Sequence, residues 1–422
     1  MCSGDAHEAT KATAGNVARI HITDWLSADR LPSHRRIFNR LSRNWLPLDA
    51  KEEITVAWNN NDLTYAGDAV PSASDPAGYI EADDNTRHVV YRGTDDRVHA
   101  LSFDGQWHHN DLIATGHPLN ALGNPVGDAW HFDHQHVVYR GTDSHVHELR
   151  FDGQWHHNDL TGAATGHPLN ATGDPVVYAY DVSGDPAAIY RGTDSHIHEL
   201  RWEDGSGQQW VDDDVTEVTG ALGHPPNAAG DPAAVYHWSG DNGHHVIYRG
   251  EDGHIHNVSL HGHSGSNYQD ITGAATGSPP DAAGEPTGCT GPDDQHVIYR
   301  GLDGHLHELV GGFNNEWRHN DLTSAATGAP PNAVGDPAVY IGDADNSQHV
   351  IYRGLDGHLH ELVGGFNNEW RHNDLTSAAT GAPPNAVGDP AVYSTDNTQY
   401  VLYRGADSHI HELSVAGAAA TS

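Results

Sequence analysis

Residues 295–340 read QHVIYRGLDGHLHELVGGFNNEWRHNDLTSAATGAPPNAVGDPAVY, and residues 348–393 repeat this stretch letter for letter. Its Tyr-Arg-Gly tripeptide recurs along the chain at intervals of 48 to 58 residues. The seven copies begin at Tyr91, Tyr139, Tyr190, Tyr248, Tyr299, Tyr352 and Tyr403. A fixed period of this length indicates a repeat architecture.

Each repeat contains four short runs rich in β-branched and aromatic residues, separated by Asp-Gly, Gly-Gly and Pro-rich breaks. Such runs are typical of strands joined by turns. In the copy around Tyr352 the expected strands cover 336–340, 349–353, 358–362 and 370–375, and no segment between Ile54 and Val415 reads as a helix. Four antiparallel strands per repeat predict an all-β fold, a seven-bladed β-propeller.

The two ends of the chain complement each other. The seventh repeat stops after His411-Glu412-Leu413 and lacks the strand that begins with Trp in the other copies. That strand stands at the front, where residues 58–64 read WNNNDLT. We therefore expect the N-terminal strand to pair with the C-terminal ones and close the ring, which removes exposed sheet edges.

The propeller is expected to cover residues 54–422, preceded by an N-terminal extension over residues 1–53 that is partly disordered. Residues 33–45 of this extension read SHRRIFNRLSRNW, with Ile37, Leu41 and Trp45 at four-residue spacing and arginines beside them. This pattern predicts one basic amphipathic helix. Docking on the ring or plugging its channel, and binding a membrane or a partner, are the two roles that remain open.

The formal net charge is −37, and beyond residue 53 the chain has 13 basic residues against 51 acidic ones. A surface this acidic repels phosphate backbones, so nucleic acid is not an expected partner. Seven of those 13 arginines belong to the Tyr-Arg-Gly copies, and we interpret them as ion-paired with an Asp in each blade.

Cys2 and Cys289 are too few for a disulfide framework. The first 20 residues lack an apolar run of signal-peptide length, and no 18-residue apolar stretch occurs anywhere. The sequence thus predicts a soluble protein without a transmembrane segment, cytoplasmic or released by a route that it does not reveal. It indicates no cofactor and leaves the oligomeric state open, a homo-oligomer included.

The length of the turn in a β-hairpin determines which residues lie opposite each other, and therefore which side chains share a face of a blade. If Asp152-Gly153 forms a two-residue turn, Glu148 lies opposite His157 and on the same face as Trp155. If Asp303-Gly304 forms the turn of the preceding hairpin, Tyr299 lies opposite Glu308. The rule predicts a Tyr, Glu, Trp and His cluster in each intact blade.

Such a cluster has the chemistry of a carbohydrate site. Aromatic faces accept the apolar side of a sugar ring, and a carboxylate and an imidazole bind its hydroxyls. The full candidate sets are Tyr139, Glu148, Trp155 and His157; Tyr299, Glu308, Trp317 and His319; and Tyr352, Glu361, Trp370 and His372. Tyr190, Glu199 and Trp210 form a weaker copy, and Tyr403, Glu412 and Trp58 meet only across the ring closure.

The other copies are eroded. Ala100 and Asn257 replace the Glu in the first and fourth repeats, and Ser266 stands near the Trp position of the fourth. A multivalent binder tolerates such losses, because its avidity survives the loss of a few sites.

The segments HVVYRGTDSHVHELRFDGQW and HVIYRGLDGHLHELVGG resemble the repeat of tectonin-like propeller lectins, the seven-bladed fucose-binding Photorhabdus type. The chain is similar, more distantly, to the six-bladed fungal fucose lectins. The likeness covers residues 54–415 and implies glycans or glycoconjugates as partners. By the fungal pattern the implied sugar ligands are Glu148, Glu199, Glu308, Glu361 and Glu412, with a Trp as stacking platform.

The fungal lectins' Arg is missing near the start of the second strand, where this chain has His136, His296 or His349. The resemblance therefore supports binding of a small sugar such as fucose or a methylated sugar without fixing which one.

Three other interpretations remain open. The 36 histidines include pairs such as His305 and His307, which alternate along a strand and suggest a metal, but two ligands without a third are not a site. Propellers also carry enzymes, yet the repeats contain no unique carboxylate pair or nucleophile motif. A protein-binding scaffold is the third alternative.

Overall fold

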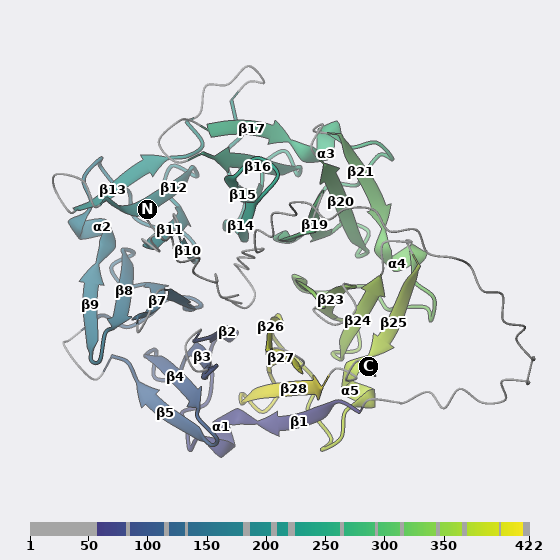
Figure 1. Cartoon of the computed structure of the whole chain (residues 1–422), viewed down its shortest axis with the longest axis horizontal. Coiled ribbons are helices and arrows are strands. Elements are labelled where there is room, and N and C mark those ends of the chain that lie inside the picture. Colours follow the sequence, from purple (N-terminus) through teal and green to yellow (C-terminus); the bar gives the residue numbers. More distant parts are fainter. Residues whose placement is uncertain are drawn as a thin grey trace, which may run out of the picture.

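The computed structural model describes residues 57–81, 85–113, 118–130, 134–179, 186–203, 209–217, 224–261, 266–291, 294–312, 316–342, 347–364, 369–395 and 398–416. Within these residues seven four-stranded antiparallel sheets surround a central axis (Figure 1). The predicted seven-bladed propeller is thereby confirmed. The predicted N-terminal extension, with its helix over 33–45, lies outside the described residues.

The strands follow one another from the inside of each blade to the outside. Blade 1 contains β2 (Ala77–Ile80), β3 (Arg87–Arg92), β4 (Val98–Phe103) and β5 (Trp107–Asp111). Blade 2 contains β6 (Val126–Trp130), β7 (His134–Arg140), β8 (Val146–Phe151) and β9 (Trp155–Asp159). Blade 3 contains β10 (Val176–Ala179), β11 (Pro186–Arg191), β12 (Ile197–Glu203) and β13 (Gln209–Asp214).

Blade 4 contains β14 (Ala234–Trp238), β15 (Gly243–Arg249), β16 (Ile255–Leu260) and β17 (Ser266–Asp270). Blade 5 contains β18 (Thr287–Thr290), β19 (Asp294–Arg300), β20 (Leu306–Gly312) and β21 (Trp317–Asp321). Blade 6 contains β22 (Ala338–Ile341), β23 (Gln348–Arg353), β24 (Leu359–Gly364) and β25 (Trp370–Asp374).

Blade 7 is built from both ends of the described chain, as the complementary ends predicted. Its inner strands are β26 (Ala391–Thr395), β27 (Thr398–Arg404) and β28 (Ile410–Ala416), and its outer strand is β1 (Asn59–Asp62). In this sheet Asn61 lies opposite Glu412. Figure 1 shows β1, at the purple end of the colour scale, beside the yellow β28.

One prediction about secondary structure was wrong, because among the described residues five single-turn helices follow outer strands. They are α1 (Leu63–Ala66), α2 (Leu160–Ala163), α3 (Ile271–Ala274), α4 (Leu322–Ala325) and α5 (Leu375–Ala378). Each begins after an Asp whose side chain accepts a hydrogen bond from a backbone N–H of the first turn, as Asp321 does from Ser324. Helices of four residues are too short to leave a periodic signal in the sequence.

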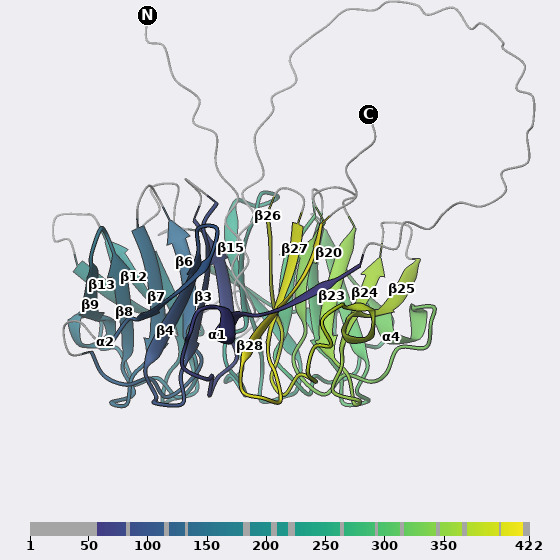
Figure 2. The ribbon, with the colours of Figure 1, turned by 90° about the horizontal axis from the view of Figure 1, so that it is seen from below.

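The two ends of the propeller differ in their connections. We call one the hairpin end, because β-hairpins join the first strand of a blade to the second and the third to the fourth there. We call the other the helix end, because it carries the Tyr-Arg-Gly loops and the single-turn helices. The hairpin end is uppermost in Figure 2.

The hydrophobic core is divided among the interfaces between blades. Trp107 of blade 1, for example, belongs to a buried cluster with Tyr393 and Leu402 of blade 7. Burying such aromatic side chains contributes most of the packing free energy, because each removes a large area from water.

At the helix end the Tyr-Arg-Gly arginines join each blade to the next, which confirms their predicted pairing with aspartates for most copies. Five arginines lie within 4.0 Å of a carboxylate of the following blade: Arg140 with Asp174, Arg191 with Asp231, Arg249 with Glu285, Arg353 with Asp389, and Arg404 with Asp75. Blade 2 has Asn124 at the acceptor position, and Arg92 instead pairs with Asp96 at 2.6 Å.

These acceptor residues form a ring around the mouth of the channel, which we call the acidic ring: Asp75, Asn124, Asp174, Asp231, Glu285, Asp336 and Asp389. Backbone N–H groups of the ring donate to the side chain of the next member, as Asp174 does to Asp231 at 2.9 Å. The preceding glycine makes room for this contact, since a Cβ on Gly335 would lie 1.8 Å from the Asp389 carboxylate.

Among the described residues, no helix has both the length and the apolar character needed to cross a membrane.

Candidate functional site

The outer hairpin of blade 2 has a different register from the one that we predicted. Glu148 lies opposite Asn158, and His157 lies opposite Leu149. The cause is a loop of three residues, Asp152 to Gln154, in place of a two-residue turn. A shift of one residue moves a side chain to the other face of the sheet, so Glu148 does not share a face with Trp155 or His157.

The hairpin between the second and third strands departs from the prediction in the same way. Tyr299 lies opposite His307, not Glu308, because five residues from Gly301 to His305 form the loop. A hydrogen bond from the Gly301 N–H to the His305 carbonyl closes this loop, and Gly304 adopts a φ of 80° within it. The predicted four-residue clusters are therefore not formed within single blades.

The glutamates are buried and bound to groups of their own blade. In blade 2 the Glu148 carboxylate lies 2.6 Å from His136 Nδ1 and accepts a hydrogen bond from Asn158 at 2.7 Å. Glu308 contacts His296 and Asn320, and Glu361 contacts His349 and Asn373, all at 2.7 to 2.8 Å. Burial raises the pKa of Glu148, but the hydrogen bonds from His136 and Asn158, together with the nearby charges of His136 and Arg150, leave the pKa below its ordinary value.

The remaining two glutamates have different partners. Glu199 accepts a short hydrogen bond from Tyr178, and burial raises the pKa of Glu199 to about 7. Glu412 accepts hydrogen bonds from Arg87 and Tyr393, each at 2.6 Å. Burial raises the pKa of Glu412 although Arg87 lowers it.

Each tryptophan faces the preceding blade. Trp370 of blade 6 belongs to a buried cluster with Ile298 of blade 5, and Ile298 lies opposite Glu308 in its sheet. Residues opposite each other share a face, so Trp370 packs on the face of blade 5 that carries Glu308. At the interface between blades 4 and 5 the contact is direct, because Trp317 Nε1 of blade 5 donates a hydrogen bond to Gln269 of blade 4 at 2.9 Å.

The predicted combination of Glu and Trp is thus present, but across neighbouring blades. The same argument from shared clusters gives four such grooves: Glu148 with Trp210, Glu308 with Trp370, Glu361 with Trp58, and Glu412 with Trp107. We call these the Glu–Trp grooves. In the other three interfaces one partner differs: Ala100 faces Trp155, Asn257 faces Trp317, and Glu199 faces the blade that has Ser266 in place of Trp.

The tyrosines of the predicted clusters have structural contacts. Tyr139, Tyr299 and Tyr352 are buried, and each donates its hydroxyl to a backbone carbonyl of the segment that leads into its blade. Tyr190 donates to Asp212 at 3.1 Å. These contacts join the second strand of a blade to other segments and leave the tyrosines in the core.

The predicted histidines belong to hydrogen-bonded chains that run toward the helix end. His319 Nε2 lies 2.9 Å from His307 Nδ1, and His307 Nε2 lies 3.1 Å from Asp303. His372 and His157 take the corresponding places in blades 6 and 2.

Arg87 fills the Glu–Trp groove between blades 7 and 1. Its guanidinium lies 4.2 Å from the ring centre of Phe103, 4.4 Å from that of Tyr400 and 5.0 Å from that of Trp107. The Arg87 guanidinium therefore makes cation–π contacts with three rings and an ion pair with Glu412.

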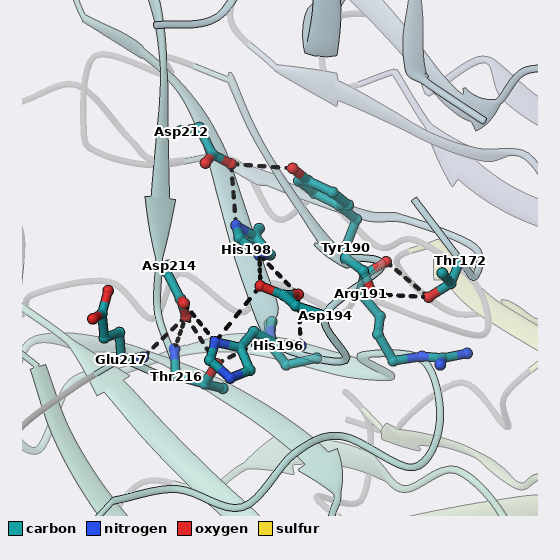
Figure 3. Close-up of polar contacts among 12 residues, drawn as sticks. Thr172, Tyr190, Arg191, Asp194, His196, His198, Asp212, Asp214, Thr216 and Glu217 are labelled. Carbon is teal, nitrogen blue, oxygen red and sulfur yellow. Dashed lines mark hydrogen bonds and ion pairs between the residues drawn. The ribbon is translucent and has the colours of Figure 1, made fainter. Parts of the chain in front are cut away.

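A second kind of cluster, which we did not identify in the sequence, lies at the helix end of the blades. In blade 3, His196 Nδ1 lies 2.6 Å from Asp214 and 3.8 Å from Asp194 (Figure 3). Figure 3 also shows His198 beside Asp194 and Asp212. The signal was present in the sequence, because an Asp stands two residues before this His in each copy and another Asp ends the outer strand.

Comparisons with solved structures find several chains of low sequence identity. AofleA from Arthrobotrys oligospora is 12% identical, with a TM-score of 0.41, over 75% of this chain and 90% of its own. The SapL1 lectin in complex with alpha methyl fucoside is 14% identical, with a TM-score of 0.44, over 72% of this chain and 95% of its own. BBS1N in complex with ARL6DN is 10% identical, with a TM-score of 0.48, over 86% of this chain and 98% of its own.

At these identities and scores, the likenesses do not indicate what this chain binds. No protein-family model matches the sequence, and no curated protein matches it.

Proposed function

We propose that this propeller is a multivalent carbohydrate-binding protein, a lectin without catalytic activity, that recognises a small sugar epitope such as fucose or a methylated sugar. The observation that carries the proposal is the repeated pairing of a glutamate of one blade with a tryptophan of the next in the four Glu–Trp grooves. The indole offers an apolar platform for the C–H face of a sugar, and the carboxylate accepts hydrogen bonds from its hydroxyls.

Burial determines how such a groove would work. The glutamate side chains of these grooves have already lost their water, and their hydrogen bonds lie in a medium of low dielectric constant. A sugar hydroxyl that replaces an Asn or His donor at the carboxylate therefore adds no desolvation cost for the carboxylate itself. The grooves must open toward the hairpin end to admit the ring, because Glu308 is 2% exposed and Trp370 is 4% exposed.

The grooves are not equivalent in this proposal. The groove between blades 5 and 6 and the groove between blades 6 and 7 have glutamates that are each held by one His and one Asn of their own blade. Arg87 fills the groove between blades 7 and 1, so we expect this groove to bind the sugar weakly. The groove between blades 1 and 2 has Ala100 in place of the glutamate, and its Trp155 is half-buried. It therefore offers a sugar only an aromatic ring to stack on.

The test is a glycan array on the purified chain, with and without chelator. Glu308→Gln together with Glu361→Gln changes two groove carboxylates and keeps their shape and one acceptor oxygen. Glu316→Ala together with Glu369→Ala is the matched control, because it removes carboxylates from the same two repeats outside the grooves. We expect selective binding that falls in the first variant and persists in the second. No binding to any glycan by the folded chain would refute the proposal.

A further inference from the structure

The cluster of two carboxylates and one imidazole at the helix end has the composition of a metal site. In blade 2, His145 Nδ1 lies 3.0 Å from Asp159 Oδ2 and 3.8 Å from Asp143 Oδ2. One ligand atom from each of the three residues can be chosen so that all lie within 4.8 Å of one another. A single ion with bonds of about 2.0–2.2 Å fits among atoms at this separation.

The backbone holds the carboxylates in place before any ion arrives. Asp143 Oδ1 accepts hydrogen bonds from the His145 N–H and from His147, each at 3.0 Å, which leaves Oδ2 turned toward the cluster. Asp159 Oδ1 caps helix α2 by accepting from the Gly162 N–H at 2.7 Å. One oxygen of each carboxylate thus has a backbone partner, while Asp143 Oδ2 and both oxygens of Asp159 face His145.

The arrangement recurs around the ring. His254 contacts Asp270, His305 contacts Asp321, His358 contacts Asp374, and His409 contacts Asp62, each through Nδ1 at 2.8 to 3.0 Å. Blade 3 has the same pair in His196 and Asp214 (Figure 3). In blade 2 the three side chains are 29% to 36% exposed, so a hydrated ion can reach them.

Blade 1 supplies an independent observation about the same place. Its loop has Arg97 where the other blades have His, and the guanidinium forms an ion pair with Asp111, the counterpart of Asp159. A permanent cation therefore occupies this position in blade 1. With a neutral imidazole, the other six clusters have two carboxylates and no fixed cation between them.

We propose that the six Asp–His–Asp clusters bind a divalent transition-metal ion of the zinc type, and that Arg97 prevents binding in blade 1. Imidazole nitrogen favours Zn²⁺ and its neighbours over Ca²⁺ and Mg²⁺, which prefer oxygen ligands. His145 would bind through Nδ1 in the neutral tautomer that carries its proton on Nε2. Water completes the coordination, as expected of a partly exposed site with three protein ligands.

These clusters are separate from the Glu–Trp grooves. In the outer strands β9, β21 and β25 the Trp is the first residue and the cluster Asp is the last, as Trp155 and Asp159 are in β9. The metal proposal can therefore fail while sugar binding holds, and the reverse.

The experiment is equilibrium dialysis of the full chain against Zn²⁺ at neutral pH. His145→Arg together with His305→Arg recreates the arrangement of blade 1 in two blades and keeps the ion pair with the cluster Asp. We expect this variant to lose two of six bound ions. The matched control is His108→Arg together with His156→Arg, whose histidines each contact one Asp at the hairpin end, and it should retain all six.

A second pair of variants covers the case in which the arginines disturb folding. Asp143→Asn with Asp303→Asn removes one carboxylate ligand from each of two clusters and keeps an oxygen that accepts the loop N–H. It should lower the zinc affinity of two sites at least tenfold. Absence of zinc binding, or binding that is equal in the wild type and in both cluster variants, would overturn the proposal.

Discussion

Arg87 of blade 1 and Glu412 of blade 7 form a buried ion pair, with Nη1 2.6 Å from Oε2, across the junction where the two ends of the chain meet. The two side chains are 9% and 4% exposed. Three aromatic rings surround the guanidinium, so water cannot replace either partner. The junction of the ring is thus held by a charge pair as well as by the β1–β28 ladder.

Removing one partner of this pair should destabilise the ring strongly. We expect Arg87→Ala to lower the free energy of unfolding by about 3–5 kcal/mol, because it leaves the Glu412 charge buried and unpaired. Urea denaturation measures the change. Arg150→Ala, at an exposed ion pair with Asp152, is the control and should cost less than about 1 kcal/mol. Equal effects of the two substitutions would contradict this account.

The acidic ring should make stability depend on pH. Burial, with repulsion from Asp336 and Asp75, raises the pKa of Asp389 to about 7. A carboxyl with a raised folded pKa binds its proton more tightly in the folded state, so its contribution to stability is fully present below about pH 4 and is lost progressively as the pH rises from there to about 7.

Asp389→Asn should therefore stabilise the protein at pH 8 by roughly 1–3 kcal/mol and by about a third of that amount at pH 5, since one pKa unit is worth about 1.4 kcal/mol before screening. Asn124 already occupies this ring position in blade 2, so the amide fits. Thermal unfolding at both pH values is the measurement, with the exposed Asp104→Asn as control. A stabilisation at pH 5 as large as at pH 8 would exclude this explanation.

A glycine precedes six of the seven ring residues, and these glycines should be intolerant of a side chain. In Gly335→Ala the new Cβ would lie 1.8 Å from the Asp389 carboxylate and displace it from the ring. We expect a loss of about 1–3 kcal/mol, the usual cost of overpacking. Gly153→Ala is a useful comparison, because its Cβ would meet no atom within 4 Å and only its φ of 103° resists substitution. Chemical denaturation of both variants should rank Gly335→Ala as the more damaging at equal folding yield.

The sequence predicted the blades and their closure because both depend on patterns within the chain. Runs of β-branched and aromatic residues between turn signals marked the strands, and the WNNNDLT segment identified β1 as the strand missing from blade 7, where Asn61 lies opposite Glu412. Local composition determines such features, so no knowledge of the tertiary contacts was needed.

The contents of the grooves could not be predicted in the same way. Asp152-Gly153 was interpreted as a two-residue turn, but Gln154 also belongs to the loop, and this one residue moved Glu148 to the other face. The pairing of Glu308 with Trp370 depends on which faces of two blades meet, and a sequence period does not contain that information. The Asp–His–Asp clusters, by contrast, had a sequence signal in the repeated spacing of Asp143, His145 and Asp159.

The shared construction of blade 7 has a consequence for how the protein is made. Strand β1 leaves the ribosome before every other described strand, yet its partner β28 ends at Ala416, close to the end of the chain. Residues Asn59 to Asp62 must therefore wait, unpaired, through the synthesis of six complete blades. The earliest strand to be translated is the last to find its place in a sheet.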